Sequence, residues 1–365
     1  MSASPAPRAN RWLDDLAAYK PGAHGGPGRA NVLRLASNEC PLGPNPKALA
    51  AAQAALASVH RYADGAAVAL RQAIAQAHGL DVHRIVCGTG SDEILQLCPL
   101  AFCAPGDEVI HAQYGFMVYA IAARRVGAVP IAVPEQNFTA DVDAILAAVS
   151  GKTRIVFLAN PNNPTGTRVS DDDIARLHAG LPSDVLLVLD GAYAEYVEDP
   201  GYDAGKALAS SAPNVLMTRT FSKLHGLAGE RIGWAYGPAS VIDALNKIRG
   251  PFNVSTAGQA AAIASIEDAE WIAHVRQDNA TQRSILFKAL EEMGLKPIPG
   301  QANFILTQFP SAQVAGQVVS TLSDQGIYVR HLPGLGLADC IRIGVGTAAE
   351  TQAFIAALKA VLADL

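Results

Sequence analysis

A lysine and an arginine lie eight positions apart in a loop rich in glycine and hydroxyl groups, residues 220–233 (TFSKLHGLAGERIG). Lysine is a nucleophile used in carbonyl chemistry. Arg231, Ser222 and Thr220 are natural ligands of a phosphate group. A glycine-rich surface loop with solvated charges is the alternative, but crowding both cations among hydroxyls argues against it. Lys223 is therefore the candidate nucleophile, with an anion site beside it.

A second candidate anion site is the segment 88–93 (GTGSDE), which stands between an apolar run and a helical pattern. Its glycines let the backbone approach a ligand, and the start of a helix offers free N–H groups to an anion. We interpret Gly90 and Ser91 as part of a phosphate cup; an ordinary turn with acidic residues at the helix start is equally compatible. Because Glu93 replaces the third glycine of the dinucleotide fingerprint, a nicotinamide dehydrogenase is disfavoured.

Three more polar residues stand in or directly after apolar runs. Asn163 lies in the rigid loop 160–166 (NPNNPTG), where a simple turn is the favoured interpretation. Asp190 ends an apolar run and either caps a helix or faces a cationic ring nitrogen. Arg342 lies inside the apolar run 340–344, where a buried arginine needs an anionic partner, structural or substrate.

From residue 84 onward, short apolar runs alternate with helical patterns. The runs predict strands at 84–87, 108–112, 131–133, 155–159, 185–189 and 215–218, and the intervening patterns predict helices at 92–101, 119–125 and 174–178, after earlier helices at 46–58 and 68–78. Runs that do not alternate with polar residues indicate a mostly parallel sheet flanked by helices on both faces. Ligands bind such α/β sheets at the carboxyl ends of the strands, where the candidate residues stand.

The pattern changes after about residue 255. We expect one long helix over 257–293, strands at 303–307, 327–330 and 340–344, and helices at 313–324 and 351–365. These elements predict a smaller α+β domain at 256–365, following a large α/β domain at 46–255. Residues 1–45, with many prolines and glycines, are predicted to be an arm that packs with the small domain or a partner subunit.

Composition excludes several classes of protein. Half of the residues are hydrophobic and the net charge is −5, so a sizeable core is expected and nucleic acid is not an expected partner. No apolar stretch reaches the roughly 18 residues of a membrane span, and the first ten residues do not resemble a signal peptide, so we expect a cytoplasmic protein. Five cysteines without a Cys-x-x-Cys pair argue against a disulfide framework or a metal site.

In this order and spacing, the segments resemble the fold type I pyridoxal-phosphate enzymes of the aspartate aminotransferase superfamily. Within it, the chain is similar to the histidinol-phosphate aminotransferases through YKPG at 19–22, LASNECPLGP at 35–44, RYAD at 61–64 and RIGVGT at 342–347. The resemblance runs from about residue 16 to the C-terminus. It departs from the usual family pattern at Lys20, Cys40 and Ala63, none of which touches the lysine chemistry.

The resemblance implies pyridoxal 5'-phosphate as cofactor. Lys223 would form a Schiff base with it and move the proton, and Asp190 would pair with the pyridinium nitrogen. The other residues implied to bind the cofactor are Tyr193 and Asn163 at the ring oxygen, Tyr114 against the ring face, and Gly90, Ser91, Thr220, Ser222 and Arg231 at the phosphate.

The resemblance also implies a homodimer, because Tyr62 would reach the cofactor phosphate in the neighbouring subunit. Arg342 would bind the acidic group of the substrate, and Arg330, Tyr19 and Asn38 are further candidates for that pocket.

The reaction implied is a ping-pong transamination in histidine biosynthesis, between L-glutamate/2-oxoglutarate and L-histidinol phosphate/imidazole-acetol phosphate. An aromatic amino acid aminotransferase or a decarboxylase of phosphorylated substrates would use similar machinery. A cofactor-binding regulator on this fold would carry a DNA-binding segment before residue 16, where the sequence leaves no room for one.

Overall fold

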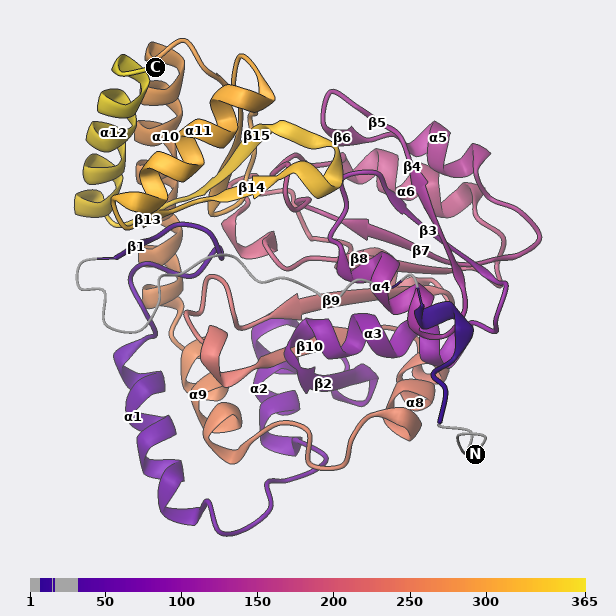
Figure 1. Ribbon diagram of the computed structural model, residues 1–365. Coiled ribbons are helices and arrows are strands. Elements are labelled where there is room, and N and C mark those ends of the chain that lie inside the picture. Colours follow the sequence, from indigo (N-terminus) through magenta and orange to yellow (C-terminus); the bar gives the residue numbers. More distant parts are fainter. Residues whose placement is uncertain (1–6, 15, 17–31) are drawn as a thin grey trace, which may run out of the picture.

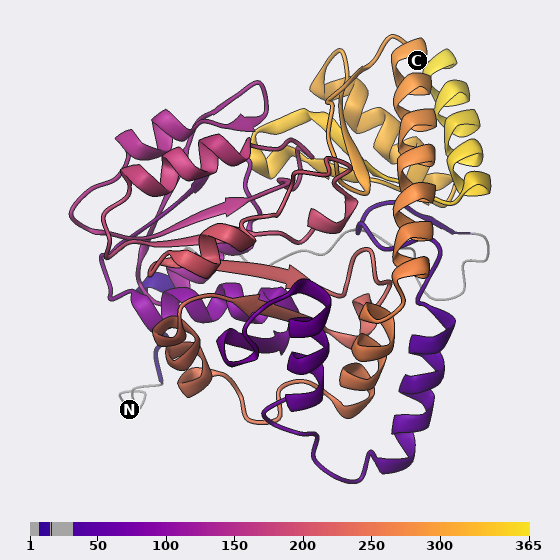
Figure 2. The same ribbon diagram turned by 180° about the vertical axis from the view of Figure 1, so that it is seen from behind.

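A computed structural model describes residues 7–14, 16 and 32–365 of the protein. Tyr19, predicted to bind substrate, lies outside the described residues. Within the described part, two sheets with their own helices lie side by side, the larger one formed mainly by the first two-thirds of the chain (Figures 1 and 2).

The larger sheet has seven strands in the order β2-β10-β9-β8-β7-β3-β4. Their bounds are β2 (Ile85–Thr89), β3 (Glu108–Ala112), β4 (Val129–Val133), β7 (Thr153–Ala159), β8 (Leu186–Asp190), β9 (Val215–Thr220) and β10 (Ile232–Tyr236). All strands run in one direction except β10, which is antiparallel to both of its neighbours. The predicted mostly parallel α/β sheet is confirmed, but β10 was not predicted, because its short run IGWAY directly follows the candidate site loop.

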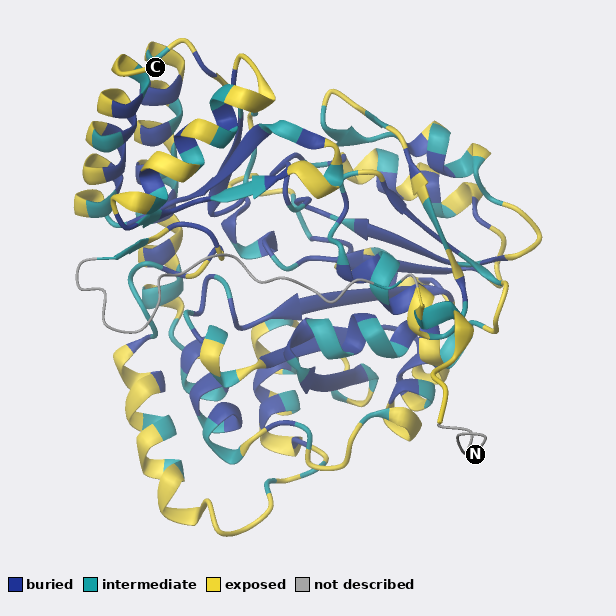
Figure 3. Ribbon diagram, in the orientation of Figure 1, coloured by how far each residue is buried: buried dark blue, intermediate teal, exposed yellow. Residues whose placement is uncertain are grey.

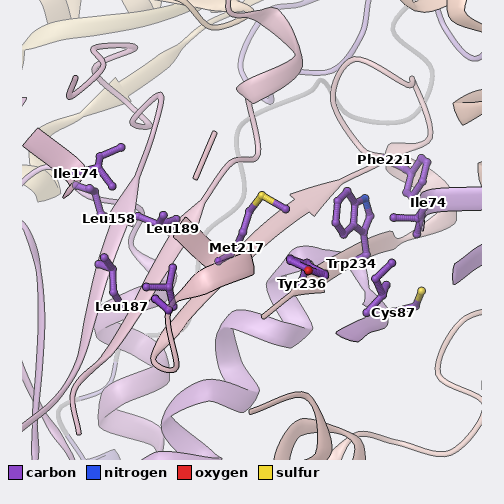
Figure 4. Close-up of a cluster of buried hydrophobic side chains, with 14 of the residues drawn as sticks. Ile74, Cys87, Leu158, Ile174, Leu187, Leu189, Met217, Phe221, Trp234 and Tyr236 are labelled. Atoms are coloured by element: carbon purple, nitrogen blue, oxygen red, sulfur yellow. The ribbon is translucent and has the colours of Figure 1, made fainter. Parts of the chain in front are cut away.

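Helices cover both faces of this sheet, and Figure 3 shows most of its strands buried, whereas the edge strand β4 is more exposed. Leu187 and Leu189 of β8 belong to one core, part of which appears in Figure 4, and Leu186 and Val188 belong to the other. The first core includes helices α1 (Pro46–Ala55), α2 (Val68–His78), α5 (Val142–Ala147), α6 (Asp171–Gly180), α7 (Lys206–Ser211) and α9 (Thr256–Ile266); the second includes α3 (Gly90–Phe102), α4 (Val118–Arg125) and α8 (Ala239–Ile248). Burial on both faces explains why these runs are uniformly apolar.

The smaller sheet has four strands in the order β11-β12-β15-β14, and all neighbours are antiparallel. The strands are β11 (Lys296–Pro297), β12 (Phe304–Gln308), β14 (Arg330–Leu332) and β15 (Leu337–Gly344). Helices α10 (Ala269–Glu292), α11 (Ala312–Asp324) and α12 (Ala348–Ala363) share a core with it. This agrees with the α+β character expected for the C-terminal part. Among the described residues, no helix is long and apolar enough to cross a membrane.

The single helix expected over 257–293 is wrong: the chain forms α9 and α10, with a break at Glu267 and Asp268. The Asp268 side chain caps α10 by accepting a hydrogen bond from the Trp271 N–H at 3.1 Å. The apolar pattern continues through the break and conceals it. Ala261 and Ile266 of α9 pack in the core of the larger sheet, so that core extends beyond residue 255, and the division into domains stays a prediction.

The 3-10 helix Arg11–Leu13 lies against α4, where the Trp12 indole N–H donates to the Arg125 carbonyl at 3.2 Å, whereas residues 33–35 lie along the smaller sheet before the chain enters the space between the two sheets. Strand β1 (Leu33–Arg34) pairs in parallel with β13 (Ile327–Tyr328), and Leu35 is buried in the core of α10–α12. The Leu35 carbonyl accepts a hydrogen bond from the Gly344 N–H at 2.8 Å. This pairing delivers residues 36–38 to the larger sheet. A small hairpin, β5 (Glu135–Gln136) and β6 (Thr139–Ala140), completes the strands.

The close approach of β10 to the start of α3 gives a test of this packing. A Cβ atom at Gly233 would lie 2.1 Å from the Ser91 nitrogen. We expect Gly233→Ala to lower the free energy of unfolding by about 1–3 kcal/mol or more. The control is Gly316→Ala in α11, because an added Cβ meets open space there. This substitution should stabilise the folded protein by about 0.5–1 kcal/mol. Chemical denaturation measures both; equal stability of the two variants would contradict the packing.

Candidate active site

The predicted site residues converge on one cleft of about 240 Å³ between the two sheets. Strands β2, β7, β8 and β9 run in one direction, so their carboxyl ends meet at one edge of the larger sheet. The smaller sheet closes the opposite side. The predicted residues that line the cleft are Asn38, Gly90, Ser91, Asn163, Asp190, Tyr193, Thr220, Ser222, Lys223, Arg231, Arg330 and Arg342.

Lys223 lies in the loop after β9, and its ammonium group faces the cleft. Its Nζ donates a hydrogen bond to the Ser37 carbonyl at 3.3 Å and lies 5.6 Å from the centroid of the Tyr193 ring. Within the described chain, no carboxylate lies within 4 Å of this amine. The amine is therefore held by one neutral acceptor and an aromatic face, which leaves it available to a ligand.

The anion cup is built from the start of α3 and the loop that carries Arg231. Gly90 has φ +76°, and a Cβ there would lie 2.7 Å from Arg231 Nη2, so only glycine lets the guanidinium lie over the helix start. Arg231 Nη1 donates to Ser222 Oγ at 3.3 Å, and Thr220 Oγ1 accepts from the Ser222 N–H at 3.1 Å. A guanidinium beside a positive helix end is unfavourable alone, so the arrangement calls for a phosphate-like anion.

Asp190 is a buried carboxylate whose partners are neutral donors. It accepts hydrogen bonds from the Tyr119 hydroxyl at 2.7 Å, the Thr218 hydroxyl at 3.2 Å and the Ala192 N–H at 3.2 Å. Burial raises the pKa of Asp190, and these three donors oppose the rise. A carboxylate so placed is stabilised by a cation or a shared proton, and it lines the cleft that holds Lys223.

Tyr119 was not predicted to be a site residue, although it lines the cleft and holds Asp190. Its ring stacks on Phe157 with centroids 4.6 Å apart and planes 5° apart. In the sequence it is an aromatic residue in the first turn of a helix, which is also typical of a core residue. In the sequence, only the position of Tyr119, just after the loop that follows β3, indicated that it could lie at the site.

Asn163 and Tyr193 face the cleft through hydrogen bonds that fix their polar ends. Asn163 Oδ1 accepts from Arg342 Nη1 at 2.5 Å, which leaves the amide NH₂ group as a donor. The Tyr193 hydroxyl accepts from Asn38 Nδ2 at 2.9 Å and can still donate its own proton. These two residues therefore present hydrogen-bond donors from different elements to the same cleft.

Two arginines form the wall opposite the sheet. Arg330 of β14 and Arg342 of β15 are direct partners in the antiparallel register. Arg342 is buried, and its Nη2 donates a hydrogen bond to the Ala36 carbonyl at 2.6 Å. Its Cζ lies over the Phe304 ring, 5.3 Å from the ring centroid. Because like charges opposite each other in a sheet repel, an anion between these side chains would stabilise the pair.

Two predicted residues lie elsewhere. Tyr114 does not line the cleft. The centroid of its ring lies 6.0 Å from that of the Phe138 ring, and its backbone N–H donates a hydrogen bond to Glu135 Oε1. Phe116, two positions further on, lines the cleft instead, so the cleft geometry does not support a ring-face contact for Tyr114. Tyr62 is 84% exposed and lies outside its own chain's cleft, in the loop after α1.

At one edge of the larger sheet, the cleft brings together a lysine, a buried carboxylate and a cup suited to an anion. The family model for aminotransferases of class I and II matches residues 30–358. The chain therefore belongs to the class I and II aminotransferases.

Several relatives of the chain are named histidinol-phosphate aminotransferase. The chain is 53% identical to the one from Erythrobacter litoralis, with 94% of each chain covered, and 50% identical to that from Ruegeria pomeroyi, with 95% of each covered. It is also similar to the solved histidinol-phosphate aminotransferase of Sinorhizobium meliloti in complex with pyridoxal-5'-phosphate: TM-score 0.90, 31% identity and full coverage of both chains. The aromatic aminotransferase of Pyrococcus horikoshii shares the fold at 23% identity and TM-score 0.80, with 92% and 97% covered.

Tyr119→Phe tests whether the Tyr119 hydroxyl stabilises the ionised carboxylate of Asp190. The variant keeps the ring stack but removes a donor to the charged carboxylate, so the pKa of Asp190, already raised, should rise further. Because the ionised form then becomes more costly, the loss of stability should grow as pH rises through the folded-state pKa of Asp190, which burial places above the ordinary value of about 3.9, and should approach about 1.5–3 kcal/mol at neutral pH.

Denaturation of the apoprotein at acidic and neutral pH measures this difference. The matched control is Tyr202→Phe, which removes a hydrogen bond to the neutral Asn160 carbonyl and should cost about 1 kcal/mol at both pH values. A pH-independent loss in Tyr119→Phe would show that Asp190 is not held as a carboxylate by this hydroxyl.

Proposed function

We propose that the protein is a pyridoxal-phosphate-dependent aminotransferase that moves an amino group between L-glutamate and imidazole-acetol phosphate, forming L-histidinol phosphate for histidine biosynthesis. The observation that carries the proposal is that Lys223, Asp190 and the Gly90–Arg231 cup line a single cleft. The relatives that share about half of the sequence have the matching name.

The cleft fits the cofactor in two independent respects. A Cβ atom at position 90 would occupy the cup. The Arg231 guanidinium, the Ser222 hydroxyl and the N–H groups at the start of α3 suit a phosphate. At the other end, the buried Asp190 has only neutral donors and suits a protonated pyridine nitrogen. Tyr193 and Asn163 would donate to the ring oxygen between these ends. When bound, the cofactor supplies an electrophilic carbon and a ring that withdraws electrons.

The protein's own residues then perform the proton transfers. The Lys223 amine, held by the Ser37 carbonyl, is the base that takes the proton from the substrate Cα and later returns one. Asp190 keeps a proton on the ring nitrogen, and Tyr119 and Thr218 fix the orientation of its carboxylate. The two sheets that enclose the cleft limit the access of water to these groups.

The two arginines suit a substrate with an anionic group, a carboxylate or a phosphate. Arg342 would bind the carboxylate of glutamate or the phosphate of histidinol phosphate, and Arg330 would add a second cation for the same group. Asn38, which holds the Tyr193 hydroxyl, lies next to this pocket, and Tyr19 stays a prediction. The relatives that are 53% and 50% identical to the chain are named histidinol-phosphate aminotransferases, so an aromatic amino acid aminotransferase and a decarboxylase of phosphorylated substrates are not favoured.

The functional unit we propose is a homodimer in the cytoplasm, made of an arm (1–45), a large domain (46–255) and a small domain (256–365). The exposed Tyr62 cannot serve the cleft of its own chain, which supports a role at the cofactor phosphate of a second copy.

Lys223→Ala tests the nucleophile. We expect a folded protein whose turnover falls about 10³-fold or more, because no other lysine among the described residues lines the cleft. The control is the exposed Lys288→Ala, which should keep full activity. In the unaltered protein, the visible absorbance of the bound cofactor should change with glutamate and be restored by imidazole-acetol phosphate. Turnover at the normal rate by Lys223→Ala would refute the assignment.

Arg342→Lys and Arg330→Lys test the substrate wall. Lysine keeps the charge but cannot form the bidentate hydrogen bonds that a guanidinium makes with a carboxylate or phosphate. We therefore expect kcat/KM for glutamate and histidinol phosphate to fall about 10- to 100-fold in Arg342→Lys. Steady-state assays with phenylalanine as a third substrate separate the alternatives. A kcat/KM for phenylalanine equal to that for histidinol phosphate in the unaltered protein would favour an aromatic aminotransferase instead.

A further inference from the structure

We infer that Phe252 is a positioning residue that holds Tyr62 in the outward orientation from which it reaches the cofactor phosphate of a second copy. The inference rests on the proposed function, which gives Tyr62 that role, and adds the residue through which the chain sets Tyr62 in place. Phe252 lies in the segment between α8 and α9, far from Tyr62 in sequence.

The Tyr62 ring is held mainly by one stacking contact. Its centroid lies 4.6 Å from that of Phe252, with the planes 18° apart. Residues 56–62 are all exposed, so the loop gives the ring little other packing; Figure 3 shows this region below α1. Within the described chain the Tyr62 hydroxyl forms no hydrogen bond, so it is free to bind an anion. Without the stack, so exposed a side chain would populate several rotamers.

The backbone of Phe252 is set in a conformation that non-glycine residues rarely adopt, with φ +55°. The flanking residues impose it. Arg249 donates to Asn253 Oδ1 at 2.9 Å and to the Gly65 carbonyl at 2.6 Å, which ties the segment 249–253 to the loop of Tyr62. A Cβ at Gly65 would lie 3.2 Å from the Phe252 ring, so the two loops are in close contact. Such strain persists where the surroundings over-determine it, typically at functional sites.

The same segment is bonded to the anion cup of its own chain. Asn253 Nδ2 donates to Glu93 Oε2 at 2.7 Å, and the Thr89 hydroxyl donates to the Asn253 carbonyl at 2.8 Å. Glu93 in turn accepts from the Thr89 N–H at 2.6 Å, immediately before Gly90. In a two-fold dimer, each phosphate would therefore be held from two sides by the two copies of segment 249–253: one through Glu93, the other through Phe252 and Tyr62.

Cofactor titration of the apoenzyme tests the role of Phe252. We expect Phe252→Ala to weaken cofactor binding about two- to tenfold, the range that loss of an aromatic pair predicts. Phe252→Tyr should restore it, because the ring is kept. Tyr62→Phe removes only the hydroxyl and should also weaken binding, and the double variant Tyr62→Phe/Phe252→Ala should be no weaker than the worse single variant. The control Ile248→Ala removes an exposed apolar side chain of the neighbouring helix end and should bind normally.

Mixed dimers show in which subunit Phe252 acts. A Lys223→Ala chain paired with a Phe252→Ala chain has one working lysine, which receives Tyr62 from the chain with an intact Phe252. We expect normal cofactor affinity at that site, whereas a Lys223→Ala/Phe252→Ala chain paired with an unaltered chain should show the full loss. The inference is overturned if the loss follows the chain that carries the lysine, if Phe252→Ala binds normally, or if no mixed dimer forms. Failure of the unaltered protein to bind the cofactor would instead refute the proposed function.

Discussion

A buried carboxylate at the end of a central strand is the constraint on which the rest of the site depends. Asp190 ends β8 and lies opposite Thr218 of β9 in the parallel register, which brings the Thr218 hydroxyl within hydrogen-bond distance. Tyr119 reaches it from α4 because that helix begins two strands away at the same sheet edge. Moving either β9 or α4 would take one of the donors away from this buried carboxylate, which is costly.

The anion cup and the arginine wall then fix the two ends of the ligand space. The cup belongs to the larger sheet and depends on glycine at position 90, while Arg330 and Arg342 belong to the smaller sheet. Residues 36–38 join the two, since the Ala36 carbonyl accepts from Arg342 and the Ser37 carbonyl accepts from Lys223. A change in how the sheets lie relative to each other would therefore alter the nucleophile and the substrate wall together.

Most of the sheet and the chemically distinctive residues could be predicted from the sequence, because each signal is local. Lys223 and Arg231 share one loop, and Asp190 directly ends an apolar run. Tyr119 could not be separated from a core aromatic residue, because its bond to Asp190 joins residues 71 positions apart. Tyr114 and Phe116 stand in the same loop, and only the folded backbone decides which ring turns toward the cleft. The break at Asp268 depends on a cap that interrupts an otherwise helical pattern.

The central claim is that the amine of Lys223 and the carboxylate of Asp190 flank one cofactor ring. It is tested most directly by loading the protein with pyridoxal phosphate, reducing it with borohydride and mapping the labelled peptide by mass spectrometry. We expect a single label, on Lys223, that is weakened or lost in Asp190→Ala. A label on another lysine, or no label at all, would contradict this placement of the cofactor.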